Sequence, residues 1–535
     1  MCDDTSEALG EWTSQSQVSE SRPGAPRFKF CLTLFMTLAL VIIAGCHAPR
    51  QDKGTVVFLI ESSPTNLDPR IGIDAQSEHI DELLFDGLVV RDASFRVAPG
   101  LAERWEQPDP LTIVFHLHAG VQFSDGRPLT SRDVAWTLES MRNGAIITPK
   151  AASYASVAGI DAPDAATVVL HLKYPDNFLL TNLSSGAMGI VPYGSGRDFW
   201  QHPVGSGPFR FVSQEIDKEV VIERNPMSWQ KDAGNVQRVR FAVVPDPTTR
   251  ALELRKGSAD LESNSLLPDM LPVLAAEKQL AVESVGGTQV QYIAFNTIDP
   301  ILRDVRVRQA IACAIDVPLI VKTLQAGRAR PAVSLLPQTH WAWTGDVARY
   351  NYDPQRAGHL LDEAGYKPGK DGVRLHLTMK TSTDEGTRLL AATLQQELAQ
   401  VGVALELRSF ESATFLQDLT RGSFQMYGLR WVGGNEQPDI FGYAFSTARI
   451  PPKGANRGRY HNPELDAVLD DAAKSTDQAK RKADYARAQQ ILARDLPAVN
   501  LWYKDTIVVH NRRLSEIVLN PSGSFKFVCA MRVQM

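Results

Sequence analysis

Apolar and polar positions alternate along residues 112–118 with the period of a β-strand. Ile113, Phe115 and Leu117 fall on one face, and Val114 lies with two histidines on the other. A period of two over this length predicts a half-buried strand. Further strands are predicted for residues 55–60, 167–172, 292–297, 374–379, 403–407, 501–503 and 506–510.

Helical spacing follows directly after Thr130. Val134, Leu138 and Met141 lie at i, i+4 and i+7, so they form one apolar stripe. Thr130 can serve as the N-cap, with Asp133 as the weaker, aspartate version of a capping box. Other helices are predicted for residues 79–88, 304–315, 387–401, 463–472 and 476–492. Strands that alternate with helices predict an α/β fold built in layers.

The order of residues between Pro99 and Leu138 is more specific than its periodicity. The segment reads PGLAERWEQPDPLTIVFHLHAGVQFSDGRPLTSRDVAWTL. It resembles the segment by which the family 5 solute-binding proteins are recognised, the dipeptide- and oligopeptide-binding receptors of ABC importers. The matching positions are Leu101, Ala102, Glu103, Trp105, Phe115, Leu117, Gly120, Val121, Phe123, Asp125, Gly126, Pro128, Leu129, Thr130, Asp133 and Val134.

Later segments are similar to the same family, so the resemblance covers about residues 54–513. The sequence PVGSGPFRFV at 203–212 and the sequence DVRVRQAIACAID at 304–316 are the clearest of these. The glycines of the first could be mistaken for a phosphate-binding loop. No Lys-Ser/Thr pair follows them, however, and no G-x-G-x-x-G pattern is present.

The resemblance implies an α/β, two-lobed periplasmic-binding-protein type II fold with an extra small domain and a hinge between the lobes. A chain of 535 residues is in any case longer than one core usually supports. The implied organisation is a signal peptide in 1–45, a tether in 46–54, lobe I in 55–88, 191–288 and 501–535, a small domain in 89–190, and lobe II in 289–500.

The N-terminus has the pattern of a lipoprotein signal. Three basic residues, Arg22, Arg27 and Lys29, precede the apolar run 31–45, which is shorter than a spanning helix requires. The sequence Ile-Ala-Gly-Cys that ends at Cys46 resembles a bacterial lipobox. We therefore predict lipidation at Cys46, with the membrane contacted through this anchor only; the alternative is an uncleaved anchor with a chance cysteine.

Two cysteines, Cys313 and Cys529, would remain as unmodified residues of the mature chain after the signal is removed and Cys46 is lipidated. An exported protein could oxidise them, but their spacing does not show that they meet. Two buried thiols are the favoured interpretation.

Candidate ligand residues come from the resemblance. It places the loop 71–76 and the glycine-rich loop 428–441 against the ligand, and Trp431 is the strongest candidate. This residue and the other aromatic residues expected in loops or at strand ends could equally be core residues, because buried tryptophan is common. The others are Trp341, Trp343, Trp502 and Tyr503. The complete set is Ile73, Asp74, Ala75, Tyr154, Arg430, Trp431, Gly433, Gly434, Asn435, Asp439 and Trp502.

The second of these loops departs from its relatives at one position. In peptide-binding members an aspartate three residues after the tryptophan pairs with the peptide's α-amino group. Here that position is Gly434, and the basic Arg430 precedes Trp431. Glu436 or Asp439 would have to swing back to replace the aspartate. We therefore expect weak or absent selection for a free amine. The ligand would be an N-blocked or cyclic peptide, an anionic solute that Arg430 can reach, or not a peptide.

No enzyme motif was found: G-x-S-x-G, H-E-x-x-H, a P-loop and C-x-x-C are absent from the sequence. His116 and His118 share a strand face but lack further ligands at useful spacing, so a solvated face is preferred to a metal site. The net charge of −5 gives no reason to expect nucleic acid. The prediction is a monomeric binding protein without cofactor or metal, which delivers a peptide-like solute to an ABC permease and ATPase. A non-peptide solute, or a sensing or folding-accessory role of the same fold, remains the alternative.

Overall fold

The computed structural model describes residues 54–185, 188–231, 234–433 and 436–534. The described residues belong to one compact unit, 53–535. The predicted signal peptide and Cys46 lie outside the described residues, as do Gly434 and Asn435 of the ligand loop.

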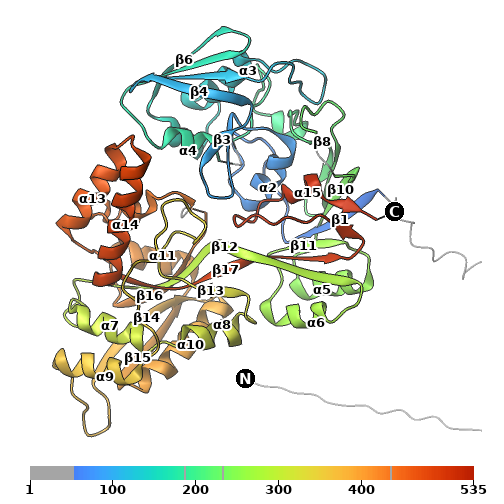
Figure 1. The fold of residues 1–535 in the computed structure, drawn as a ribbon. Helices are drawn as coiled ribbons and strands as arrows, with labels where there is room; N and C mark the ends of the chain where they lie inside the picture. Colours follow the sequence, from blue (N-terminus) through green and yellow to red (C-terminus); the bar gives the residue numbers. More distant parts are fainter. Residues whose placement is uncertain (1–53, 186–187, 232–233, 434–435, 535) are drawn as a thin grey trace, which may run out of the picture. The chain divides into compact units, whose positions relative to one another are not determined.

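A mixed β-sheet is the centre of this unit (Figure 1). In the described residues eleven strands join it, in the order β15-β14-β16-β12-β17-β11-β1-β10-β9-β8, with β13 paired to β17. Its strands are β1 (Thr55–Ile60), β8 (Phe209–Glu215), β9 (Glu219–Arg224), β10 (Arg238–Val243), β11 (Leu261–Ser263), β12 (Leu280–Phe295), β13 (Ala329–Pro331), β14 (Leu375–Ser382), β15 (Val403–Phe410), β16 (Met426–Trp431) and β17 (Ala498–Asn511).

The long antiparallel pair β12 and β17 connects the two halves of the sheet. Its register runs from Leu280 opposite Asn511 to Gly286 opposite Asp505, and resumes with Val290 opposite Tyr503. The shift is a β-bulge, where extra residues on one strand bend the ladder. The strands predicted at 501–503 and 506–510 are therefore one strand, and the strand predicted to open at 292 begins at Leu280.

Helix α2 (Ala75–Leu84) covers the β1 half of the sheet and begins earlier than the predicted 79–88. It starts there because Asp74 caps it: the Ser77 amide donates to Asp74 Oδ1 at 2.9 Å. The apolar face of α2 packs with Phe58 and other buried side chains of β1, β9 and β10. The last strand β19 (Arg532–Val533), its partner β18 (Leu514–Ser515) and helix α15 (Phe527–Ala530) complete this core.

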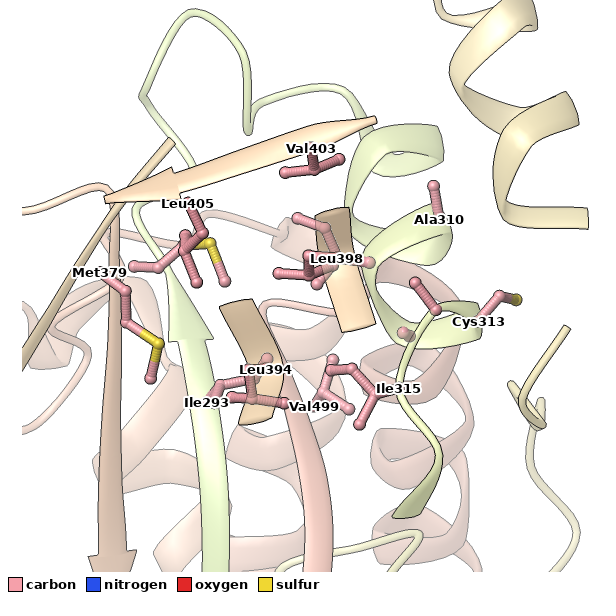
Figure 2. Close-up of a cluster of buried hydrophobic side chains, with 14 of the residues drawn as sticks. Ile293, Ala310, Cys313, Ile315, Met379, Leu394, Leu398, Val403, Leu405 and Val499 are labelled. Atoms are coloured by element: carbon pink, nitrogen blue, oxygen red, sulfur yellow. The ribbon is translucent and has the colours of Figure 1, made fainter. Parts of the chain in front are cut away.

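Helices on the β14 half follow the predicted pattern. The helix predicted at 304–315 is α7 (Val305–Cys313), capped by Asp304, and the one predicted at 387–401 is α10 (Glu385–Ala399). With α8 (Val317–Leu324) and α9 (Pro354–Glu363) they enclose a core that includes Met379, Leu394 and Cys313 (Figure 2). Cys313 is buried and Cys529 is half-buried, and no disulfide joins the two.

Helices α12 (Ile440–Phe445), α13 (Pro463–Lys474) and α14 (Gln478–Asp495) pack as a second group. Helix α11 (Ser412–Arg421) packs separately, against β14 and β15. Helices α13 and α14 confirm the predictions at 463–472 and 476–492. Tyr485 and Phe441 anchor the cluster that holds α12 and α14 together.

A separate four-stranded sheet lies within residues 89–190, in the order β4-β5-β7-β6. Strands β5 (Thr112–Leu117) and β7 (Thr167–Leu172) confirm the two alternating patterns, with the apolar positions buried. Helix α3 (Ser131–Arg142) begins after Thr130, whose amide donates to the Asp133 carboxylate at 2.7 Å. The other elements of residues 89–190 are β2 (Val89–Arg91), β3 (Val97–Pro99), β4 (Ala102–Asp109), β6 (Val157–Asp164) and α4 (Leu179–Leu183). Two further helices, α5 (Pro247–Lys256) and α6 (Leu271–Ala275), lie beside the large sheet. Among the residues described, none of the helices has the length and apolar character needed to cross a membrane.

Candidate functional site

The carboxyl ends of strands from both halves of the large sheet meet at the bulge. Strand β11 ends with Ser263 opposite Val508, just short of the bulge on β17. Strand β16 ends with Trp431 opposite Val290, at the other side of it. Strands β1 and β14 run parallel to β11 and β16. In open α/β sheets ligands bind outside the carboxyl ends of strands, so this meeting point is the candidate ligand site.

The bulge itself is tightly packed. A Cβ atom added at Gly287 would lie 2.3 Å from the carbonyl oxygen of Lys504, so only glycine fits between the two strands here. Thr288 follows and is buried. At the bulge, β12 therefore contains a position that accepts no side chain.

Two positive side chains occupy the bulge and the adjoining strand end. Lys504 lies on β17 at the bulge and Arg430 lies on β16. Burial lowers the pKa of Lys504 and the charge of Arg430 lowers it further, while the charges of Glu262 and Glu61 oppose the shift. The described part of the chain offers neither side chain a hydrogen bond or an ion pair. A desolvated ammonium beside a second cation is an environment that favours an anionic group.

Arg430 also approaches the end of β14. Burial raises the pKa of Asp384, but bonds from Thr387 and the charge of Arg430 outweigh this and hold it below its usual value. Arg430 itself is exposed. Its guanidinium is therefore accessible to a solute while remaining within electrostatic range of both Asp384 and Lys504.

An ion pair joins the small-sheet region to the glycine-rich loop. Arg91, at the end of β2, donates to the Glu436 carboxylate at 2.9 Å, and the two side chains are only 14% and 17% exposed. The same guanidinium donates to Ser184 Oγ and the Thr181 carbonyl oxygen. Nearby, the Trp341 amide donates to the Ser94 carbonyl oxygen. These contacts link residues 89–190 to residues 289–500.

Burial raises the pKa of Glu436 to about 7, although Arg91 opposes the shift and a bond from Thr288 does so more weakly. Asp439, which precedes α12, has its pKa raised to about 6, again by burial. Glu436 is therefore held by Arg91 and by the bulge. Asp439, with a pKa of about 6, is largely ionised at neutral pH, but it lies partly buried at the start of α12 and not at the position three residues after Trp431.

Trp431 is half-buried at the end of β16. Its ring stacks on Tyr292 with 5.9 Å between centroids, and its edge meets Tyr443. Gly433 follows with φ of 75°, a conformation that favours glycine, and is exposed. The strand end thus presents one aromatic side chain backed by a second.

The other sequence candidates have different environments. Ile73 is 61% exposed and Ala75 is exposed, at the start of α2. Asp74 is occupied by capping; burial raises its pKa, but bonds from Ser77 and Thr65 lower it below its usual value. Tyr154 and Trp502 are 3% and 4% exposed and pack in two hydrophobic cores. Their burial gives these two a packing role, and we do not retain them as ligand residues.

Three residues at the site were missed: Arg91, Thr288 and Lys504. No local pattern identifies them, because each gains its role from a partner hundreds of residues away or from the bulge. His116, considered for a metal, lies 3.1 Å from Glu106 on the neighbouring strand. Within the described ranges, no group of three or more His, Cys, Asp or Glu side chains could hold a metal ion.

Comparison with known proteins gives one consistent result. The model of the bacterial extracellular solute-binding proteins, family 5, matches residues 96–451. The dipeptide-binding protein of Escherichia coli (strain K12) is 25% identical over 521 residues, which cover 92% of this chain and 97% of that protein. The glutathione-binding protein GsiB of Pectobacterium atrosepticum is 27% identical, with 92% and 97% covered. Among solved structures, HbpA2 from Haemophilus parasuis has a TM-score of 0.79 at 26% identity, covering 90% of this chain and all of that one.

Proposed function

The chain belongs to the bacterial extracellular solute-binding proteins of family 5, and we propose that it captures a peptide-like, anionic solute at the bulge between its two sheet halves. The family supplies substrates to ABC importers, and its members are periplasmic or extracytoplasmic binding proteins rather than enzymes. One observation carries the proposal: strand ends from both halves converge on β12 and β17 beside Arg430, Trp431 and Lys504.

The proposal divides the chain as the resemblance implies. Lobe I comprises 55–88, 191–288 and 501–535, lobe II comprises 289–500, and 89–190 is the extra domain. The boundaries at 288/289 and 500/501 fall near the bulge, where the β12–β17 register shifts. We place the hinge there, since a few residues at such a point can absorb a rigid-body movement. The solute would be released unchanged to a permease and its ATPase.

The chemistry of the site supports an anionic ligand. The dipeptide- and glutathione-binding relatives make a peptide-like solute the natural starting point. In this chain two cations without partners among the described residues, Arg430 and Lys504, offer charge-assisted hydrogen bonds to a carboxylate or phosphate. The loop acids do not offer an equivalent pocket for an ammonium group, because Glu436 is engaged by Arg91.

Ligand binding should close the hinge and stabilise the fold. Small-angle X-ray scattering should give a smaller radius of gyration with the correct solute, since only a ligand that prefers the closed state shifts the equilibrium. At a hundredfold excess over Kd the stability gain is about 2.7 kcal/mol. A thermal-shift screen of di- to pentapeptides, N-acetylated peptides, amino acids, sugars and chelated metals would identify the solute. A screen in which no compound raises the melting temperature would refute the proposed function.

The anchor is a separate proposal, supported by the lipobox-like sequence that ends at Cys46. Replacing Cys46 by serine should move the protein from the membrane fraction to the soluble fraction, because a serine hydroxyl is not acylated. Metabolic labelling with a palmitate analogue would give the direct measurement. Incorporation that persists in Cys46→Ser would place the lipid elsewhere, and a protein that never labels would exclude the anchor.

A further inference from the structure

A large cavity lies within residues 312–501, away from the bulge. Its volume is about 440 Å³, within the ~300–1,000 Å³ range of small-molecule sites. The end of α7, the chain around Pro331–Leu335, the C-terminal part of α14 and the start of β17 form its walls. None of Arg91, Arg430, Trp431, Glu436 and Lys504 lines it. The cavity is therefore a different site from the proposed solute cleft.

The wall is mostly apolar. Ile315 and Val499, which lie beside each other in Figure 2, join Phe441, Leu492 and Leu496 around the space. The cavity opens to solvent along residues 348–352, most of which are exposed. Its apolar interior offers contact area to an apolar molecule, as in most small-molecule sites.

The polar side chains of the wall differ in what they have left to bind. Ser334 donates to Gln489 Oε1 at 2.7 Å, and Gln489 Nε2 donates to two backbone oxygens, so these two groups satisfy each other. Asn500 lines the same cavity, and no described residue bonds to its amide. Its Oδ1 atom is buried without a partner. An unpaired buried amide costs free energy that a bound hydroxyl or amide group would recover.

We propose that this cavity is a second binding site, for a small, neutral, mainly apolar molecule with one hydroxyl or amide group that bonds to Asn500. The inference is independent of the proposed transport function. Arg349, on the exposed segment beside the cavity, is its charged lining residue, and its Nη2 atom donates to the Gly345 carbonyl oxygen. The rest of the wall carries no charged side chain, and this favours a neutral occupant there.

Two probes that differ only in a hydroxyl group test the chemistry: 4-ethylphenol and ethylbenzene. Calorimetry on the full chain should show that both bind, with 4-ethylphenol about fivefold tighter because of one hydrogen bond to the amide. In Asn500→Leu the two probes should bind with equal affinity. If neither probe binds the unmodified protein up to its solubility limit, the proposal is wrong.

A second variant locates the bound probe without altering Asn500. Ala493→Phe, on α14 at the cavity wall, should fill the space and lower the binding affinity of both probes at least about tenfold. Ala483→Phe, on an exposed position of the same helix outside the wall, is the matched control and should bind normally. Trp431→Ala should also bind the probes normally, which separates this site from the solute cleft. Undiminished binding to Ala493→Phe would place the probes elsewhere and overturn the inference.

Discussion

Replacing Gly287 by alanine should lower the free energy of unfolding by about 2 kcal/mol, since overpacking a filled interior typically costs this much. The added Cβ would meet the Lys504 carbonyl oxygen at 2.3 Å, and a backbone atom paired in a sheet cannot move aside cheaply. The substitution should also weaken binding of the cognate solute, because the displaced strand is one of the two strands that we propose connect the lobes. Urea unfolding gives the first quantity and calorimetry the second.

The neighbouring glycine provides the control. A Cβ at Gly286 would meet the side chain of Arg330, with its Nε at 3.2 Å. That side chain is 53% exposed, and a shift of a few tenths of an ångström keeps its ion pair with Asp505, at 3.1 Å, within reach. Gly286→Ala should therefore stay within about 0.5 kcal/mol of the unmodified protein. Equal free energies of unfolding of the two variants would mean that the contact between position 287 and the Lys504 backbone does not limit packing at the bulge.

Local patterns predicted the elements that local chemistry determines. Strand β5 and helix α3 were predicted because alternation and a capping box act within a few residues, and both are as expected. The start of α2 was misplaced because its first turn is polar and shows no apolar stripe. Asp74, five residues before the predicted start, sets the boundary through its cap. Strand β17 was divided in two because Lys504 and Asp505, at the bulge, interrupt its apolar pattern.

The site was predictable only in part. The loop that follows β16 was located by its sequence, and Trp431 and Arg430 lie at the strand end beside the bulge. Arg91 reaches Glu436 across a sequence separation of 345 residues, which no single-sequence pattern encodes. Tyr154 and Trp502 were proposed as ligand residues and are buried in the structure. The sequence alone does not distinguish an aromatic residue in a core from one in a cleft. Burial decides between the two, and burial is a property of the whole fold.

Selection for a free amino terminus should be absent in this protein. A tripeptide such as Ala-Ala-Ala would bring its ammonium group towards Arg430 and Lys504, and like charges in a desolvated cleft are unfavourable. Glu436 is paired to Arg91, and Asp439, although largely ionised at neutral pH with a pKa of about 6, lies partly buried before α12, so neither replaces the missing aspartate. Acetyl-Ala-Ala-Ala should therefore bind at least as tightly as the free peptide in calorimetry. A preference of more than about tenfold for the free peptide would show that another acid replaces the missing aspartate.

Gly434→Asp should reverse this preference. The loop position three residues after Trp431 would then hold a carboxylate, and hydrogen bonds between charged groups contribute about 1.5–3 kcal/mol, so the free peptide should bind about thirtyfold tighter than the acetylated one. Gly434→Asn is the matched control, because it has the same shape without the charge and should give no such preference. If Asn and Asp variants behave alike, the charge at this position does not set amine recognition. If only the aspartate variant selects the amine, the glycine at 434 is what directs this chain away from free peptides and towards solutes that its two cations can hold.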